Sequence, residues 1–108
     1  MITLLLAATV ASATPAFTLT EIAPGVFAAI SNTADETAGG NSGFVIGEEA
    51  VLVVDAFGSE KAAERLLAEI RSRTKLPIRF SVLTHFHSDH MSGSAVFARA
   101  GAAVLAHE

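Results

Sequence analysis

The chain has 108 residues, of which 51% are hydrophobic and 17% charged, and its formal net charge is −4. The hydrophobic content excludes a disordered linker, and a negative charge without any basic stripe argues against nucleic acid as a partner. The sequence contains no cysteine, which excludes a disulfide framework and any thiolate metal ligand within these residues.

Residues 1–16 have the features of a secretory signal peptide. Met1 to Val10 is almost wholly apolar, and the small residues of Ala11-Ser12-Ala13 and Thr14-Pro15-Ala16 are both typical of cleavage sites. The run is shorter than the about 20 apolar residues of a membrane-spanning helix, so we expect no stable membrane span. We therefore predict a periplasmic or secreted protein. No basic residue lies near Met1, which leaves a buried first strand as the alternative.

Two strands are predicted next, over residues 18–22 and 26–30. The turn Ala23-Pro24-Gly25 separates them, because proline presets φ and glycine accepts a positive φ. Residues 31–40 are polar and end in two glycines, which indicates a loop. The strand Val51 to Val54 is apolar on both faces, so we expect both of its faces to be covered.

A helix is predicted over Ser59 to Arg73, because apolar residues recur there at helical spacing and Ser59 can cap its first turn. The apolar, β-branched run of residues 79–84 is typical of a strand. Residues 94–100 favour a helix that ends at Gly101, and residues 103–106 favour a last strand. Strands alternating with helices predict an α/β fold.

The loop after residue 84 holds the main functional signal, His85-Phe86-His87-Ser88-Asp89-His90. Its imidazoles and carboxylate can line two adjacent metal positions if the backbone turns sharply, which Ser88 and Gly93 would permit. Imidazole and carboxylate without thiolate suit zinc. The alternative is a surface loop that is merely rich in histidine and aspartate.

Thr84 to Gly93 resembles the signature of the metallo-β-lactamase-fold hydrolases. Residues 41–47 and 50–55 are similar to that family's second strand pair, which ends in an aspartate beside the metal site. The resemblance implies two zinc ions and a metal-activated hydroxide that attacks an ester, thioester or amide (lactam) bond of a small molecule.

The resemblance also implies a role for each motif residue. His85 and His87 would bind the first ion, and Asp89 and His90 the second, with Asp89 also orienting the nucleophile as the catalytic carboxylate. Asp55 would support the site from behind without binding metal. The alternative for Asp55 is a cap on the turn at residues 58–59.

The family's αββα sandwich is much longer than this chain. The resemblance therefore implies that residues 17–108 are its truncated N-terminal half, a mixed sheet with outer helices, and that activity of the isolated chain is doubtful. His107 follows the last strand too closely to be the next family ligand and is expected to be a strand-end or site-rim residue. A catalytically incomplete metal-binding fragment and a glyoxalase II-type thioesterase remain alternatives; the oligomeric state and the substrate stay open.

Overall fold

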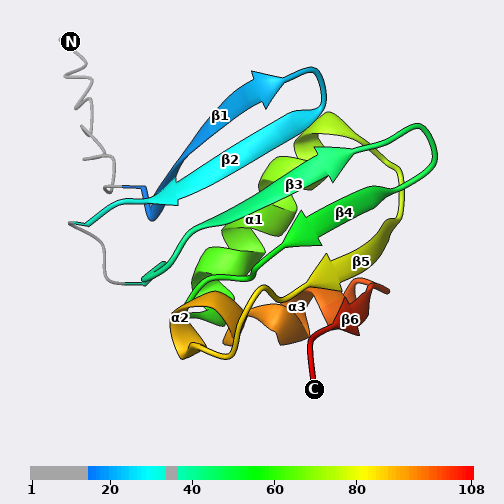
Figure 1. The fold of residues 1–108 in the computed structure, drawn as a ribbon. Helices are drawn as coiled ribbons and strands as arrows, with labels where there is room; N and C mark the ends of the chain where they lie inside the picture. The colour runs from blue at the N-terminus through cyan, green and yellow to red at the C-terminus, as the bar shows by residue number, and fades with distance from the viewer. Residues whose placement is uncertain (1–14, 34–36) are drawn as a thin grey trace, which may run out of the picture.

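The computed structural model describes residues 15–33 and 37–108 (Figure 1). The predicted signal peptide lies outside the described residues, except for Pro15 and Ala16. Within the described ranges, no helix combines the length and apolar character needed to cross a membrane.

In the described part of the chain, one sheet contains six strands in sequence order. The pairs from β1 to β4 are antiparallel, whereas β4–β5 and β5–β6 are parallel. This mixed sheet with helices confirms the predicted α/β class. The elements are β1 (Phe17–Ala23), β2 (Val26–Ser31), β3 (Ser42–Ile46), β4 (Val51–Val54), α1 (Glu60–Arg73), β5 (Ile78–Val82), α2 (Ser88–Met91), α3 (Ser94–Arg99) and β6 (Ala103–Leu105).

The first hairpin, β1–β2, forms where the sequence predicted it. Gly25 has a φ of 76°, and a Cβ built on it would lie 2.8 Å from the carbonyl oxygen of Ile46. Both the backbone conformation and the close approach therefore require glycine at this turn.

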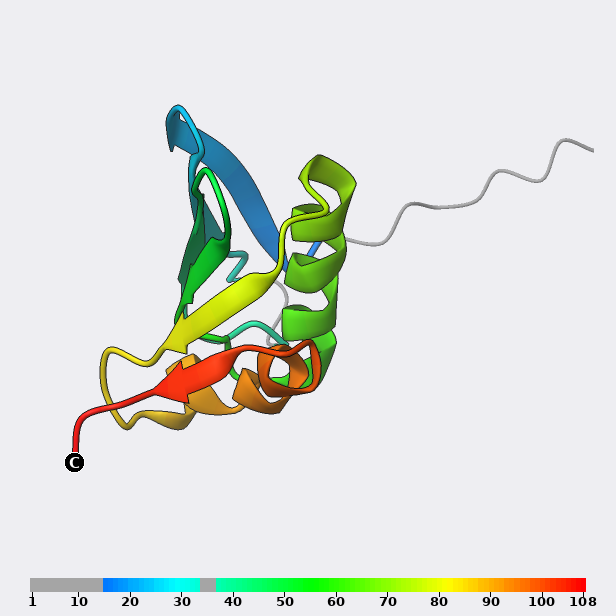
Figure 2. The ribbon, with the colours of Figure 1, turned by 90° about the vertical axis from the view of Figure 1, so that its right-hand side faces the viewer.

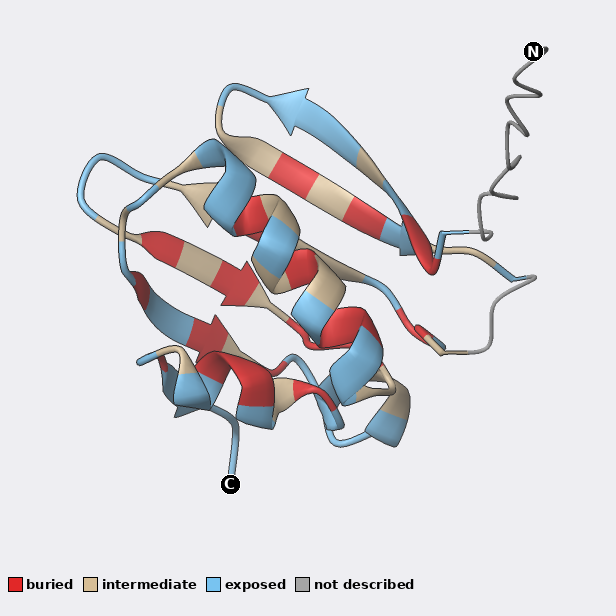
Figure 3. Ribbon diagram, turned by 180° about the vertical axis from the view of Figure 1, so that it is seen from behind, coloured by how far each residue is buried: buried red, intermediate tan, exposed pale blue. Residues whose placement is uncertain are grey.

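Helix α1 covers one face of the sheet. Ser59 caps it, because its hydroxyl accepts a hydrogen bond from the backbone N–H of Ala62 at 3.2 Å. The buried stripe of α1 includes Leu66 and Ile70 and belongs to the same core as Phe44 and Val53 of the sheet. Figure 3 shows buried and exposed residues alternating along α1 in front of buried segments of the central strands. The predicted amphipathic helix is confirmed.

The opposite face of the sheet is less well covered. Figure 2 shows α1 on one side of strands β1 to β4. Val51 and Val53 point to that side and are buried, whereas Leu52 and Val54 alternate with them and are half-buried. Phe80, which pairs with Leu52 across the β4–β5 ladder, is 39% exposed. Strand β4 is therefore apolar on both faces, as predicted, and only its α1 face is fully buried in this structure.

Candidate metal centre

The candidate site lies at the carboxyl ends of β4 and β5. These strands run parallel with Val54 opposite Val82, so the residues that follow them meet at one edge of the sheet. The backbone N–H of Asp55 donates to the carbonyl oxygen of Val82 at 2.8 Å. Asp55 and Thr84, which are far apart in sequence, are thereby brought side by side.

The motif itself is part loop and part helix. His85 and His87 precede α2, and Asp89 and His90 lie within this four-residue helix. Sequence reasoning missed α2, because four residues are too few to show a helical period. The helix bends the chain sharply after His87 and brings His90 back toward His85.

The three imidazole rings of the motif gather at this bend. The ring centroid of His85 lies 4.3 Å from that of His90 and 4.9 Å from that of His87. Asp89 Oδ2 lies 3.7 Å from Nε2 of His90. The side chain of His90 is 21% exposed and that of Asp89 is 50% exposed. His85 and His87 are exposed as whole residues, so the cluster opens to solvent.

Asp55 lies directly behind the cluster and is 7% exposed. Its Oδ1 accepts from the backbone N–H of Thr84 at 2.8 Å, and its Oδ2 lies 2.9 Å from Nδ1 of His90. These bonds hold the carboxylate toward the histidines, while Ser59 caps the helix after the turn at residues 58–59. This geometry is that of a support for His90.

Asp55 has a left-handed backbone, with φ of 59°, and so does Phe57 at 62°. Such conformations are uncommon for residues other than glycine and persist only where the surrounding structure holds them. Phe57 is fully buried and stacks on Phe17 with ring centroids 5.0 Å apart. Buried packing on one side and hydrogen bonds on the other thus hold the turn that aims the Asp55 carboxylate.

The loop that precedes β3 also packs on the motif. The backbone N–H of Gly40 donates to the carbonyl oxygen of Asp89 at 3.2 Å. A Cβ built on Gly40 would lie 2.4 Å from that oxygen and 2.8 Å from Nε2 of His90. The sequence predicted a loop here without linking it to the motif, although the pair of glycines at residues 39–40 was the signal for a close approach.

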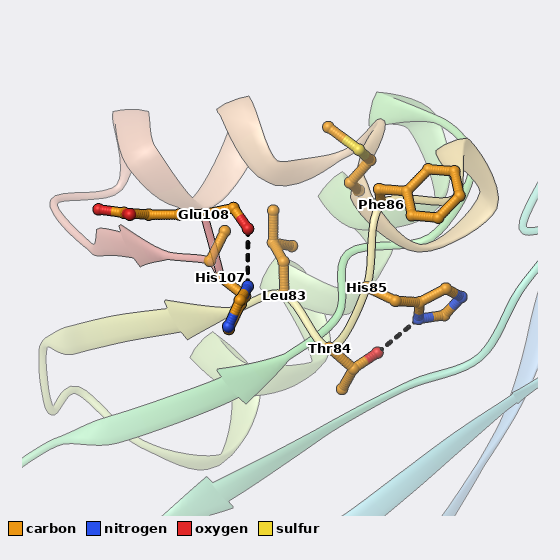
Figure 4. Close-up of a pocket in the computed structure, with 8 residues that line it drawn as sticks. Leu83, Thr84, His85, Phe86, His107 and Glu108 are labelled. Atoms are coloured by element: carbon orange, nitrogen blue, oxygen red, sulfur yellow. Dashed lines mark hydrogen bonds between the residues drawn. The ribbon is translucent and has the colours of Figure 1, made fainter.

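A cavity of about 500 Å³ adjoins the other side of His85 (Figure 4). Leu83, Phe86 and Met91 supply apolar walls, and His107 also lines it. The sequence predicted that His107 is a strand-end or site-rim residue; it lies just after β6.

Among the described residues, Asp55, His85 and His90 each offer one possible ligand atom, and these atoms all lie within 4.8 Å of one another. A metal ion bound by these three residues would have a carboxylate oxygen of Asp55 as one of its ligands. That carboxylate already accepts from Thr84 and His90, so we interpret Asp55 as the support of the cluster.

Both the sequence and the fold of the chain are similar to those of known proteins. The family model of the metallo-beta-lactamase superfamily matches residues 36–108. The linear primary-alkylsulfatase of Pseudomonas sp. (strain ATCC 19151) is 39% identical over 49 residues, which make up 45% of this chain and 9% of that protein.

Several solved structures share the fold. TMB-1 matches with a TM-score of 0.70 and 29% identity, over 86% of this chain and 44% of that chain. The metallo-beta-lactamase from Pontibacter korlensis matches with a TM-score of 0.71 and 25% identity, over 85% and 44%. FIM-1 from Pseudomonas aeruginosa, solved in its mono-zinc form, matches with a TM-score of 0.69 and 28% identity, over 83% and 41%. The chain spans less than half the length of these relatives, and the likeness confirms the predicted fold class.

Proposed function

The chain belongs to the metallo-beta-lactamase superfamily, and on this premise we propose that it is a zinc-dependent hydrolase whose metal ions bind at residues 85–90. The observation that carries the proposal is that three imidazole rings gather in front of the buried carboxylate of Asp55. The ring centroids of His90 and His87 lie 4.3 and 4.9 Å from that of His85. A merely histidine-rich surface loop would not require such support from behind.

The donor set fits zinc, because imidazole and carboxylate groups are its usual ligands when thiolates are absent. We assign His85 and His87 to one ion. Asp89 and His90 would hold the second, and their donor atoms lie 3.7 Å apart. FIM-1 was solved in a mono-zinc form. Measuring the number of zinc ions per chain therefore tests whether a second ion binds here.

When bound, zinc would supply a Lewis acid that polarises the scissile group and lowers the pKa of water. The chain's own residues would orient the reactants. Asp89 is half exposed, and we propose that it accepts a hydrogen bond from the attacking water. Asp55 keeps the ring of His90 in one orientation through its bond to Nδ1.

The substrate is proposed to be a small molecule with an ester, thioester or amide (lactam) bond. The alkylsulfatase among the relatives adds sulfate esters to the candidates. A panel containing a β-lactam, a thioester, a carboxylic ester and an alkyl sulfate would identify the class. A thioester-only result would favour the glyoxalase II-type alternative.

Zinc analysis of purified protein tests the metal assignment. For the complete protein we expect about two zinc ions per chain, and a loss of about one in each of His85→Ala and His90→Ala. His107→Ala is the matched control and should keep the full content, since His107 lies outside the motif at residues 85–90. Unchanged zinc in both motif variants, or loss in the control, would show that the ligands are wrongly assigned.

A catalytically incomplete metal-binding fragment is the second candidate, and the span of less than half of the solved relatives favours considering it. Both candidates bind zinc, so only turnover of a substrate distinguishes them. Zinc binding without hydrolysis of any substrate in the panel would support the fragment.

A further inference from the structure

Thr84 links the buried carboxylate to the first histidine of the motif. Its hydroxyl oxygen lies 2.8 Å from Oδ2 of Asp55 and 2.8 Å from Nδ1 of His85. We infer that Thr84 is a positioning residue that fixes both the tautomer and the orientation of the His85 ring. This inference rests on the proposed metal site, since it concerns how one of its ligands is presented.

The donor and acceptor chemistry of the three groups determines the direction of this hydrogen-bond chain. An ionised carboxylate only accepts, so the single hydroxyl proton of Thr84 goes to Asp55. The hydroxyl oxygen is then an acceptor toward His85, and Nδ1 of that ring must carry its proton. The lone pair of neutral His85 is consequently left on Nε2.

Asp55 therefore serves two histidines with one carboxylate. It accepts directly from Nδ1 of His90 at 2.9 Å, and it acts on His85 through the Thr84 hydroxyl. The Nδ1 atoms of the two rings face Thr84 and Asp55 respectively, which leaves the lone pair of each Nε2 available to a metal ion. Figure 4 shows the ring of His85 with one nitrogen bonded to Thr84 and the other pointing away from it.

Thr84 is itself held in place for this task. Its backbone N–H donates to Oδ1 of Asp55 at 2.8 Å, so backbone and side chain bind the same carboxylate. The hydroxyl is thus oriented before any metal binds, which lowers the entropic cost of ordering the His85 ring on binding. Partners of this kind typically change metal affinity by about 10- to 100-fold when removed.

The test compares Thr84→Val, which replaces the hydroxyl by a methyl group of similar size, with Thr84→Ser, which keeps it. Nitrogen-15 NMR of the metal-free protein, at a pH where the imidazoles are neutral, reports which ring nitrogen of each histidine carries the proton. Zinc affinity is measured in parallel by competition with a chromophoric chelator.

We expect the wild type and Thr84→Ser to hold His85 as the Nδ1–H tautomer. Thr84→Val should shift His85 toward the Nε2–H form and weaken zinc binding by about 10-fold. His90 is the internal control, because its bond to Asp55 does not involve Thr84, and its Nδ1–H signal should persist in every variant.

An unchanged His85 tautomer in a folded Thr84→Val protein would overturn the inference. If the valine variant does not fold, Thr84→Ala makes the same comparison without filling the space. The proposed function fails separately: absence of zinc binding by the wild type would reject the metal site, whereas the tautomer of His85 would still decide the role of Thr84.

Discussion

Gly40 leaves space beside the ring of His90 that a larger residue would fill. A Cβ at this position would lie 2.8 Å from the ring nitrogen Nε2 and 2.4 Å from the carbonyl oxygen of Asp89. Both contacts are too short to persist, and the second involves backbone, which cannot simply rotate away. The glycine therefore allows the loop before β3 to pack against the motif while Nε2 keeps its position.

Gly40→Ala is accordingly predicted to destabilise the protein by about 1–3 kcal/mol, the usual cost of overpacking, and to weaken zinc binding. Gly47→Ala is the matched control, because Gly47 lies at the far end of the β3–β4 pair and its Cβ would meet only the carbonyl oxygen of Ala50, at 3.1 Å. Urea unfolding and zinc titration of both variants check the prediction. Equal behaviour of the two variants would contradict it.

Gly93 illustrates a residue whose importance was recognised in the sequence for a different reason. The sequence suggested that it permits a sharp turn, but its φ is −87°, which other residues also adopt. A Cβ there would lie 2.1 Å from the carbonyl oxygen of Ala56 and 2.6 Å from Cβ of Ala63. Gly93 is needed because α1 and the residues after β4 pack directly against it.

At the scale of elements, Ser59 connects the start of α1 to the loop before β3. Its hydroxyl accepts from the backbone N–H of Ala62 at 3.2 Å and donates to the carbonyl oxygen of Thr37 at 2.5 Å. One side chain thus caps a helix and holds the loop that contacts the motif. The cap could be predicted from the sequence, whereas the bond to Thr37 could not.

Ser59→Ala is predicted to lower the free energy of unfolding by about 1 kcal/mol or more, since it removes the cap and a second hydrogen bond. Ser72→Ala serves as the control. The Ser72 hydroxyl donates to the carbonyl oxygen of Glu69 and accepts from Nη1 of the exposed Arg73, both within α1, and alanine is the better helix former. Chemical denaturation should therefore show a loss for Ser59→Ala and little change for Ser72→Ala; similar losses would refute the dual role.

Helices α1 and α3 are joined on the surface by ion pairs. Nη2 of Arg99 lies 3.2 Å from Oε2 of Glu60 and 3.8 Å from Oε1 of Glu64. The hydrogen bond and the charge of Glu60 raise the pKa of Arg99 above its ordinary value, and Glu64 adds to the effect. Because these groups are exposed, water and salt screen the pairs, and they contribute little to stability.

For the whole molecule, the sheet separates a packed face from a more open one. The packed face holds Phe44, Val51 and Val53 under α1. The other face includes Ile30, which is 51% exposed, and Phe80, which is 39% exposed. Apolar residues gathered on an open face favour association with further protein surface.

If residues 1–16 contain a signal peptide, the N-terminal segment bears on where the mature protein begins. Ala16 is 1% exposed, and its carbonyl oxygen accepts from the backbone N–H of Asn32 at 2.9 Å. Cleavage after Ala16 would remove this buried contact, whereas cleavage after Ala13 would retain it. We therefore expect exported protein to begin at Thr14, not Phe17.

N-terminal sequencing of protein recovered from the periplasm checks this expectation. Phe17 at the start would mean that the contact of Ala16 is dispensable in the mature protein. Met1 at the start of soluble protein would contradict export itself and would revive the thioesterase alternative.

The sequence alone was sufficient for most of the local structure. Alternating apolar residues, the turn at Pro24-Gly25 and the cap at Ser59 predicted strands and helix α1 close to their observed bounds, because these signals act between residues that are near in sequence. The motif at residues 85–90 was visible for the same reason, since its candidate ligands lie within six consecutive residues.

The resemblance already implied that Asp55 supports the motif, but only the tertiary structure decided which groups make that support. Asp55 meets Thr84 and His90 across 29 and 35 residues, and Gly40 reaches the motif from a third segment. Their positions depend on the parallel pairing of β4 with β5 and on the packing of the loop at residues 37–41. Such contacts depend on how distant segments of the chain pack together. A local sequence pattern shows which residues are present but not which distant residues will be in contact.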